Sequence, residues 1–208
     1  DQRAVKRDFN AYLEVVALKG FEAESDVLPS LFASGACFLT RREWIKELGY
    51  LFEPYFYFED AELSLRTVYF GGEIGYVMKS RFNHYSRLEH GIRSIDEARR
   101  KSLTLNRFSS RNKMKTIVTL FSLPNSFKLL IVHLLYVLLR CFVERREPHA
   151  IIAMIRGTVE GICEIGRCVH KHREFQKIKR RSDSYILRRL LFRQDSLMQR
   201  TFYKFLNV

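Results

Sequence analysis

The sequence predicts an α/β front part followed by an α-helical extension, on three observations. Short apolar runs alternate with helical patterns between residues 31 and 79, the order expected of an α/β domain. No convincing strand pattern occurs from residue 96 to residue 208. The charge divides as well, with 10 Lys/Arg and 13 Asp/Glu in residues 1–86 (net −3) but 26 and 10 in residues 87–208 (net +16). We therefore expect two regions, 1–95 and 96–208.

The first 39 residues predict a helix, a loop and a strand. Apolar side chains recur at helical spacing in residues 1–20, which predicts an amphipathic helix ended by Gly20. Residues 21–30 are acidic and polar and predict a loop. Residues 31–39 form a short apolar run that suits a buried strand. The apolar positions of the helix are Phe9, Tyr12, Leu13 and Val16.

Two helices and a second strand are expected next. Thr40 and Glu43 have the spacing of a capping box, which predicts a helix over 41–48 that Gly49 ends. Residues 50–58 are aromatic and predicted to be extended. Asp60 is expected at the N-cap of a helix over 61–70, which a pair of glycines ends, and residues 73–79 follow as a short strand.

The extension reads as successive helices. Basic helical patterns cover 96–121, prolines separate the next segments, and the strongly apolar stretch 127–143 lies between them. Residues 150–179 are helical with three glycines, and 180–208 form a basic amphipathic segment.

The stretch 127–143 has three possible environments. Its 17 residues include Lys128, His133 and Arg140, whereas a membrane-spanning helix needs about 20 mostly apolar residues. Basic residues on both flanks favour a helix that lies in the membrane interface, where each Lys or Arg near anionic lipid contributes about 1 kcal/mol. A core helix and a true span remain alternatives.

The composition limits the cellular compartment and the class of protein. Hydrophobic residues make up 47% and charged residues 28% of the chain, which is typical of a globular protein and not of a disordered one. The four cysteines form no Cys-x-x-Cys pair, so we expect reduced thiols and a cytoplasmic location. No signal peptide is visible in residues 1–30.

The pair Glu59-Asp60 is the strongest candidate for chemistry. It follows an aromatic run and stands at the start of a predicted helix, where the positive end of the helix dipole favours negative charge. Asp60 as a plain helix cap is the structural alternative. As a functional group, a carboxylate held there can act as a general base. The rings before it, Tyr57 among them, offer a flat face to a ring-shaped ligand such as a sugar.

The order of motifs around this pair resembles the second half of the catalytic domain of family 2 glycosyltransferases, especially rhamnosyltransferase-like members. The resemblance covers residues 30–90 and, less specifically, the extension. The motifs are a small-residue run, paired arginines, an aromatic run leading to two acids, an acid-rich helix with an arginine, and a later histidine. In this chain they are Ser34-Gly35-Ala36, Arg41-Arg42, Phe52-Glu53-Pro54-Tyr55-Phe56-Tyr57-Phe58, Glu59-Asp60-Ala61-Glu62-Leu63-Ser64-Leu65-Arg66 and His84.

This resemblance implies a GT-A (Rossmann-like) fold, a nucleotide-diphosphate sugar donor and Mg²⁺ or Mn²⁺, with transfer that inverts the anomeric centre. Asp60 would then take the proton of the acceptor hydroxyl and Glu59 would support it. His84 would approach the metal or the diphosphate. The substrate-binding positions would be Ser34, Gly35, Ala36 and Tyr57.

The chain departs from the family in two ways. Glu62 stands where an aspartate is usual, and no Asp-x-Asp metal motif occurs in any part of the sequence. The nucleotide-binding strands would belong upstream of residue 30. We therefore expect the C-terminal portion of such an enzyme, inactive alone or completed by another polypeptide, either the missing N-terminal half or a homo-oligomer partner.

The resemblance implies a metal-dependent transferase of cell-surface polysaccharide biosynthesis, and the basic extension leads us to expect it peripheral at the inner face of the cell membrane. The acceptor would be a glycan or a lipid-linked sugar, and the basic extension would face an anionic membrane surface. The alternative is a non-catalytic basic helical module that binds a membrane surface or nucleic acid. Nucleic acid is the weaker partner because no RNA-binding sheet motif, zinc-finger spacing or helix-turn-helix is evident.

Overall fold

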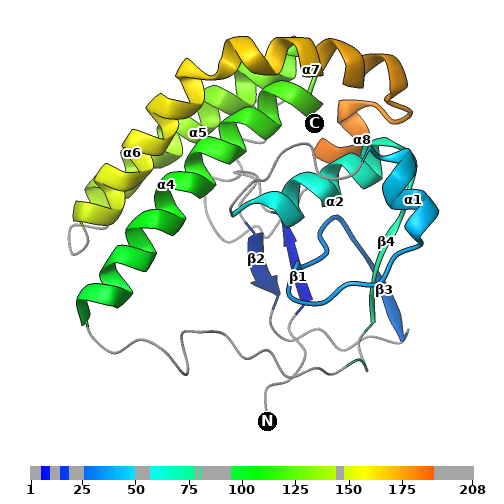
Figure 1. The fold of residues 1–208 in the computed structure, drawn as a ribbon, viewed down its shortest axis with the longest axis horizontal. Coiled ribbons are helices and arrows are strands. Elements are labelled where there is room, and N and C mark those ends of the chain that lie inside the picture. Colours follow the sequence, from blue (N-terminus) through cyan, green and yellow to red (C-terminus); the bar gives the residue numbers. More distant parts are fainter. Residues whose placement is uncertain are drawn as a thin grey trace.

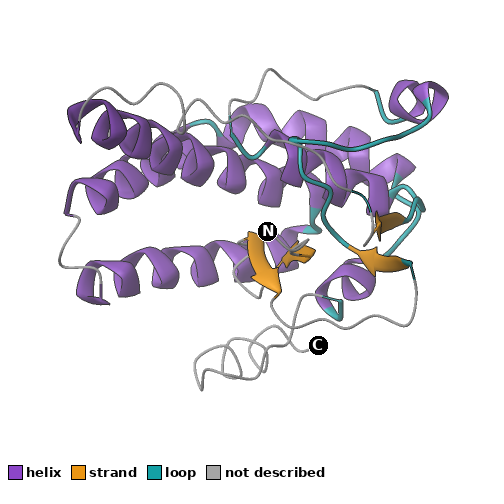
Figure 2. Cartoon of the chain, turned by 90° about the horizontal axis from the view of Figure 1, so that it is seen from below, coloured by secondary structure: helices purple, strands orange, loops and turns teal. Residues whose placement is uncertain are grey.

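The structure is a computed structural model, and it describes residues 6–9, 15–18, 26–49, 57–77, 80, 95–143 and 148–189. The described chain is mostly helical, with a few short strands (Figure 2). The helices are α1 (Arg42–Glu47), α2 (Glu59–Tyr69), α4 (Ile95–Leu120), α5 (Leu123–Val143), α6 (Pro148–Cys163), α7 (Ile165–Ile178) and α8 (Asp183–Leu187). The strands are β1 (Lys6–Phe9), β2 (Val15–Leu18), β3 (Val27–Ser30) and β4 (Ile74–Val77).

The predicted α/β, Rossmann-like GT-A architecture is wrong. The described strands form two separate two-stranded antiparallel sheets, β1–β2 and β3–β4, rather than one parallel sheet. The apolar run 31–39 fails as a strand because only its start is buried. Leu31 and Phe32 enter the core, the chain then turns, and Phe38 and Leu39 are exposed.

The helix expected over residues 1–20 is also wrong. Lys6–Phe9 pairs with Val15–Leu18 as an antiparallel hairpin, with Lys6 opposite Leu18 and Phe9 opposite Val15. β-Branched valines at 15 and 16 favour an extended backbone over a helix, which helical spacing alone did not reveal. The loop expected over 21–30 contains β3, which pairs with β4, the strand predicted over 73–79 and confirmed.

The two predicted helices of the front part are confirmed, but their caps differ. The helix α1 begins at Arg42 with Arg41 as N-cap and no side-chain cap, so the Thr40–Glu43 capping box is wrong. In α2 the N-cap is Phe58, and Asp60 lies inside the first turn. Both helices end at glycines with a positive φ, Gly49 at 77° and Gly71 at 98°, a conformation in which a side chain would be strained.

The helices expected over 96–121 and 127–143 are confirmed as α4 and α5. The helical segment expected over 150–179 is divided at Glu164 into α6 and α7. Figure 1 shows α6 and α7 along the edge of the molecule opposite the strands, with α4 packed along α6. Two glycines one turn apart permit this close packing. A Cβ at Gly157 would collide with the carbonyl oxygen of Arg107, and one at Gly161 would lie 2.7 Å from Cβ of Met114.

One hydrophobic core joins the front part to the extension. It includes Leu65 and Tyr69 from α2, Ile117 from α4, and Phe175 from α7, all at most 1% exposed. Buried apolar side chains of α5 and α8 complete it. The start of α2, with the candidate acids, is therefore held against the helical extension.

Candidate functional site

The acids Glu59 and Asp60 lie half-buried in the first turn of α2. The Asp60 carboxylate accepts two backbone hydrogen bonds. Its Oδ1 accepts from the N–H of Ala61 at 2.8 Å, and its Oδ2 accepts from the N–H of Gly35 at 3.0 Å. Glu59 differs, because its Oε2 is buried and accepts no hydrogen bond within the described part of the chain.

The run Ser34-Gly35-Ala36 lies beside Asp60, although as a turn and not as a strand. A Cβ on Gly35 would lie 3.4 Å from Cβ of Asp60, an ordinary contact distance, so the turn passes directly beside the acid. The turn is fastened to α2 by Ser64, whose Oγ accepts from the N–H of Ala33 at 3.0 Å and donates to the Asp60 carbonyl at 2.6 Å. The predicted substrate-binding turn and the predicted base are thus brought together.

The residues that precede α2 adopt a strained backbone. Tyr57 has a φ of 67° and Phe58 a φ of 74°, in the left-handed region that bulky residues rarely occupy. Each such residue costs on the order of 1–3 kcal/mol and persists only where its surroundings hold it. The prediction of an extended segment is wrong at these two residues. The left-handed backbone at Tyr57 and Phe58 sets the direction in which the chain enters α2, and therefore the placement of Glu59 and Asp60.

Residues of α4 hold this strained pair. The side-chain amide of Asn112, 0% exposed, donates to the Tyr57 carbonyl at 2.7 Å. The buried ammonium of Lys113 lies 5.9 Å from the centroid of the Phe58 ring and 5.7 Å from that of Tyr136 on α5. Sequence reasoning missed both roles. The signal available in the sequence was a pair of adjacent polar residues, Asn112 and Lys113, before a run of mostly apolar residues in the same predicted helix.

An ion pair stabilises α2 one turn beyond the acids. The Arg66 guanidinium contacts the Glu62 carboxylate at 2.9 Å and also donates to the Leu48 carbonyl at the end of α1. Burial raises the pKa of Glu62, while the charge and hydrogen bond of Arg66 act in the opposite direction. This pair is enclosed by α1 and α2, so we interpret it as part of the scaffold and not of the site.

The cations of α4 that run toward the site are paired with acids of the following helices. Arg107 forms a two-pronged ion pair with Glu160, the closest contact being 2.6 Å, and Lys115 pairs with Glu164 at 2.9 Å. Hydrogen bonds from Arg107 lower the pKa of Glu160. These ion pairs bind α4 to α6 and to the start of α7, and we therefore do not assign the two cations to a diphosphate.

A second polar cluster surrounds Asp183 at the start of α8. Its carboxylate accepts from the Tyr69 hydroxyl at 2.8 Å, from the N–H and hydroxyl of Ser122 at 2.9 and 2.6 Å, from the Asn125 amide at 2.7 Å, and from Lys179. Burial would raise the pKa of Asp183, but the hydrogen bonds from Lys179, Ser122 and Asn125 outweigh it and lower that pKa. A shallow hollow adjoins the cluster. Because its oxygens are already saturated, Asp183 fits a structural role that ties α2, α5 and α8 together.

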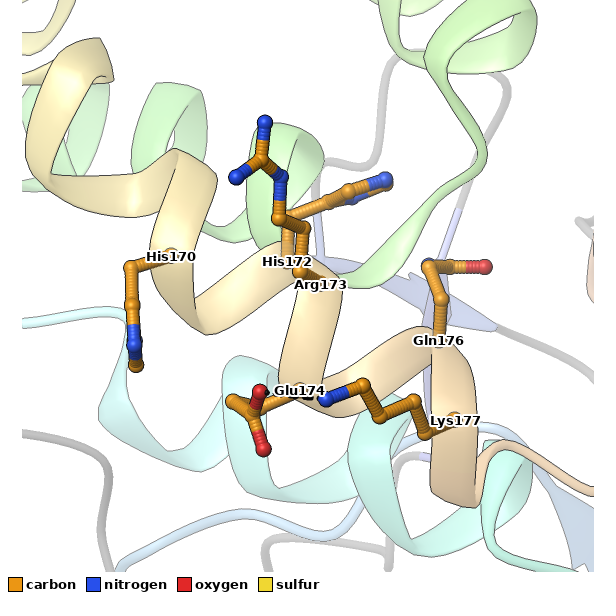
Figure 3. A pocket seen from close by; sticks show the side chains of 6 residues that line it. All are labelled: His170, His172, Arg173, Glu174, Gln176 and Lys177. Atoms are coloured by element: carbon orange, nitrogen blue, oxygen red, sulfur yellow. Dashed lines mark hydrogen bonds and ion pairs between the residues drawn. The ribbon is translucent and has the colours of Figure 1, made fainter.

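A further hollow lies on α7 and consists of side chains from that helix alone (Figure 3). Two of them turn inward, with His172 Nδ1 2.9 Å from the Val118 carbonyl oxygen and Gln176 donating to the Leu120 carbonyl at 3.1 Å. Glu174 and Lys177 pair with each other at 2.8 Å. The hollow is therefore an open surface of one helix, whose polar side chains bind the backbone of α4 or one another, and we do not assign it as a catalytic site.

The predicted metal site finds no support in the described residues. His84, the predicted metal or diphosphate ligand, lies outside them, as do Tyr55 and Phe56 of the predicted aromatic platform. Across the part of the chain that the structure describes, no three His, Cys, Asp or Glu side chains gather as a cation site. The prediction of Mg²⁺ or Mn²⁺ therefore rests on the resemblance alone.

Comparison with known proteins returned no match, whether to a protein family, to a curated protein or to a solved structure. The resemblance to family 2 glycosyltransferases therefore stays a prediction from the motifs, and the site's geometry is what supports a function.

Proposed function

We propose that this chain forms the acceptor-activating part of an inverting glycosyltransferase. It would transfer a sugar from a nucleotide-diphosphate sugar to a hydroxyl of a glycan or lipid-linked acceptor in polysaccharide biosynthesis. The observation that carries the proposal is the Asp60 carboxylate, fixed in the first turn of α2 by two backbone N–H groups beside the turn at Gly35. The proposal depends on this carboxylate and not on a Rossmann-like sheet.

Asp60 serves as the general base. Each of its oxygens accepts one hydrogen bond in the structure, which leaves lone pairs for a hydroxyl donor. The acceptor hydroxyl gives its proton to Asp60 while its oxygen bonds to the anomeric carbon. The bond from that carbon to the diphosphate oxygen breaks, and the diphosphate leaves with the electron pair. Attack from the side opposite the leaving group inverts the configuration.

Glu59 supports the acceptor beside Asp60. The Oε2 of Glu59 is enclosed by the protein and receives no hydrogen bond from a described residue, so an acceptor hydroxyl would bind the other oxygen of this half-buried carboxylate. Because adjacent residues of a helix point in different directions, Glu59 would contact a part of the acceptor other than the hydroxyl held by Asp60. Orienting the acceptor in this way lowers the barrier by removing its translational and rotational freedom.

The strained turn before α2 fits a role in preorganisation. Tyr57 and Phe58 hold a costly backbone conformation, which Asn112 and Lys113 stabilise from α4. Strain of this kind concentrates at functional sites, where it fixes a side chain in its working geometry. The Tyr57 side chain is half-buried at this turn and supplies an aromatic face near the acids.

The experiment is transfer of labelled sugar from a panel of nucleotide-diphosphate sugars to membrane-derived lipid-linked acceptors, using the complete polypeptide. Asp60→Asn should lower transfer by about 100-fold or more, the usual contribution of a general base, while leaving donor affinity intact. Ser30→Ala is the control, because Ser30 ends β3 and its Oγ donates to the Phe32 carbonyl and accepts from the Phe32 N–H.

Two outcomes would overturn the proposal. The first is transfer by Asp60→Asn at a rate within tenfold of the wild type. The second is that the wild-type protein folds and binds membranes but transfers sugar from none of the donors. That result would favour the alternative function, a non-catalytic basic helical module. Thermal melting of each variant separates a loss of chemistry from a loss of fold.

A further inference from the structure

An apolar face covers the outer side of α5 and α6. Nine large hydrophobic side chains there are 40–65% exposed. On α5 they are Leu123, Phe127, Leu134, Leu135 and Leu138, and on α6 they are Ile152, Ile155, Val159 and Ile162. Scattered apolar side chains are normal on a protein surface, but a contiguous set on two neighbouring helices marks an interaction site. We call this set the α5–α6 face.

Each of the two helices carries one exposed apolar stripe and one buried side. The helices are neighbours and touch through His133 on α5 and Thr158 on α6, whose Nε2 and Oγ1 lie 3.2 Å apart. Gly157 and Gly161 of α6 pack closely against α4. Along each helix the spacing of the exposed apolar residues places them on one side of that helix, away from its buried residues.

The region of the chain that carries the face, residues 87–208, has a net charge of +16. Within the described residues of α5 to α8, acids are turned inward or paired: Glu160 and Glu164 bind cations of α4, Asp183 is buried, and Glu174 binds Lys177. Basic side chains remain on the outside, and Figure 3 shows Arg173 and Lys177 projecting from α7. On α6 itself the exposed Arg156 pairs with Glu160 at 3.1 Å. Further exposed basic residues follow on α7 and around α8, namely Arg167, Arg173, Arg180, Arg188 and Arg189.

We infer that the α5–α6 face docks into the interface of an anionic lipid bilayer, with both helices lying in the membrane plane. Exposed apolar side chains on a strongly basic region of the chain match the acyl boundary and the anionic headgroups at once. A second copy of the chain fits less well, because residues 87–208 carry a net charge of +16 on each copy. The inference holds whether or not Asp60 performs the proposed chemistry.

The structure favours an in-plane helix over a span. The segment Leu123–Arg140 of α5 passes the length and hydropathy test for a membrane span, and 28% of it is buried inside the protein. That buried side is fastened by specific contacts. The Ser126 hydroxyl donates to the Ile117 and Phe121 carbonyls, and the Asn125 amide donates to Asp183. Spanning would break these bonds, whereas docking flat keeps them.

The experiment is flotation of the full chain with vesicles of phosphatidylcholine, alone or with about 30 mol% phosphatidylglycerol to supply the negative surface potential. The face variant is Phe127→Ser/Ile152→Ser/Val159→Ser, at positions 65%, 60% and 53% exposed. The matched control is Phe38→Ser/Leu39→Ser, which removes exposed apolar side chains from a loop far along the sequence.

We expect the wild type and the control to float with the anionic vesicles and the face variant to bind at least tenfold more weakly. Added salt should weaken binding, and alkaline carbonate should release the bound protein, as it does peripheral proteins. Equal binding by the face variant would overturn the inference, and so would retention after carbonate. Wild-type dimerisation that the face variant abolishes, without vesicle binding by either, would assign the face to a second copy and also overturn it.

Discussion

Replacing Asp183 by alanine should destabilise this protein more than any surface change. The side chain is 5% exposed and gathers hydrogen bonds from helices far apart in the sequence. Its removal leaves the Lys179 ammonium, itself 9% exposed, without its carboxylate. Breaking a buried pair by deleting one partner costs about 3–5 kcal/mol. In a chain of 208 residues, where 1 kcal/mol shifts the melting midpoint by about 2–4 °C, the loss is roughly 6–20 °C.

Thermal melting followed by circular dichroism measures this loss. The matched control is Glu174→Gln, because Glu174 also pairs with a lysine on a neighbouring turn but its side chain is 57% exposed. An exposed pair contributes little, so the control should melt near the wild type. Equal melting midpoints for the Asp183 and Glu174 variants would refute the assignment of Asp183 as the structural hub.

Acid provides a second measurement on the same residue. The hydrogen bonds that Asp183 accepts hold its pKa below the ordinary value of 3.8, although burial alone would raise it. The folded protein therefore binds this proton less readily than the unfolded chain. The resulting stability is complete above the unfolded pKa and is lost as the pH falls through the lower folded pKa. The wild type's advantage over Asp183→Asn in urea should shrink below about pH 4, and an advantage that grows there would contradict the account.

Three further predictions concern the helical scaffold. Asn112→Ala should cost about 1–3 kcal/mol in urea unfolding because the Tyr57 carbonyl loses its buried donor, and an unchanged midpoint would contradict this. Gly157→Ala should destabilise by about 1–3 kcal/mol through overpacking, whereas Gly166→Ala, with open space around it, should stabilise α7 by up to about 1 kcal/mol in thermal melts. His133 has its pKa lowered to about 3 by burial and a nearby lysine, so its ring resonances should stay constant from about pH 8 to about pH 4. Because the unfolded chain binds the His133 proton more readily than the folded protein, the free energy of unfolding should fall as the pH drops below 6.5. A titration midpoint of the His133 ring resonances near pH 6.5 would contradict its burial.

The helices were predictable where local signals agree. Helical spacing and glycine stops gave α1 and α2 within a residue or two, and prolines separated the long helices correctly. Apart from β4, the strands were not predictable, because a short apolar run does not by itself determine the backbone conformation. The run at Leu31 buries two residues and then turns, which spacing alone does not distinguish from a strand.

The sequence predicted which residues form the candidate site but not which residues hold them in place. The sequence indicated Asp60 and Gly35, and the structure brings them into a hydrogen bond. It did not indicate Ser64 or Asn112, whose roles depend on contacts across 31 and 55 residues of sequence. The left-handed backbone at Tyr57 and Phe58 was also unpredictable, because bulky residues avoid that region unless tertiary contacts hold them there.

The dependence of transfer on the acidity of the acceptor tests the role of Asp60 most directly. A fluorine beside the attacking hydroxyl of the acceptor lowers the pKa of that hydroxyl and therefore its need for a base. If Asp60 removes the proton, the deficit of Asp60→Asn relative to the wild type should shrink with the fluorinated acceptor. A deficit that stays the same for both acceptors would show that Asp60 only supports the turn at Gly35, and the general-base account would fail.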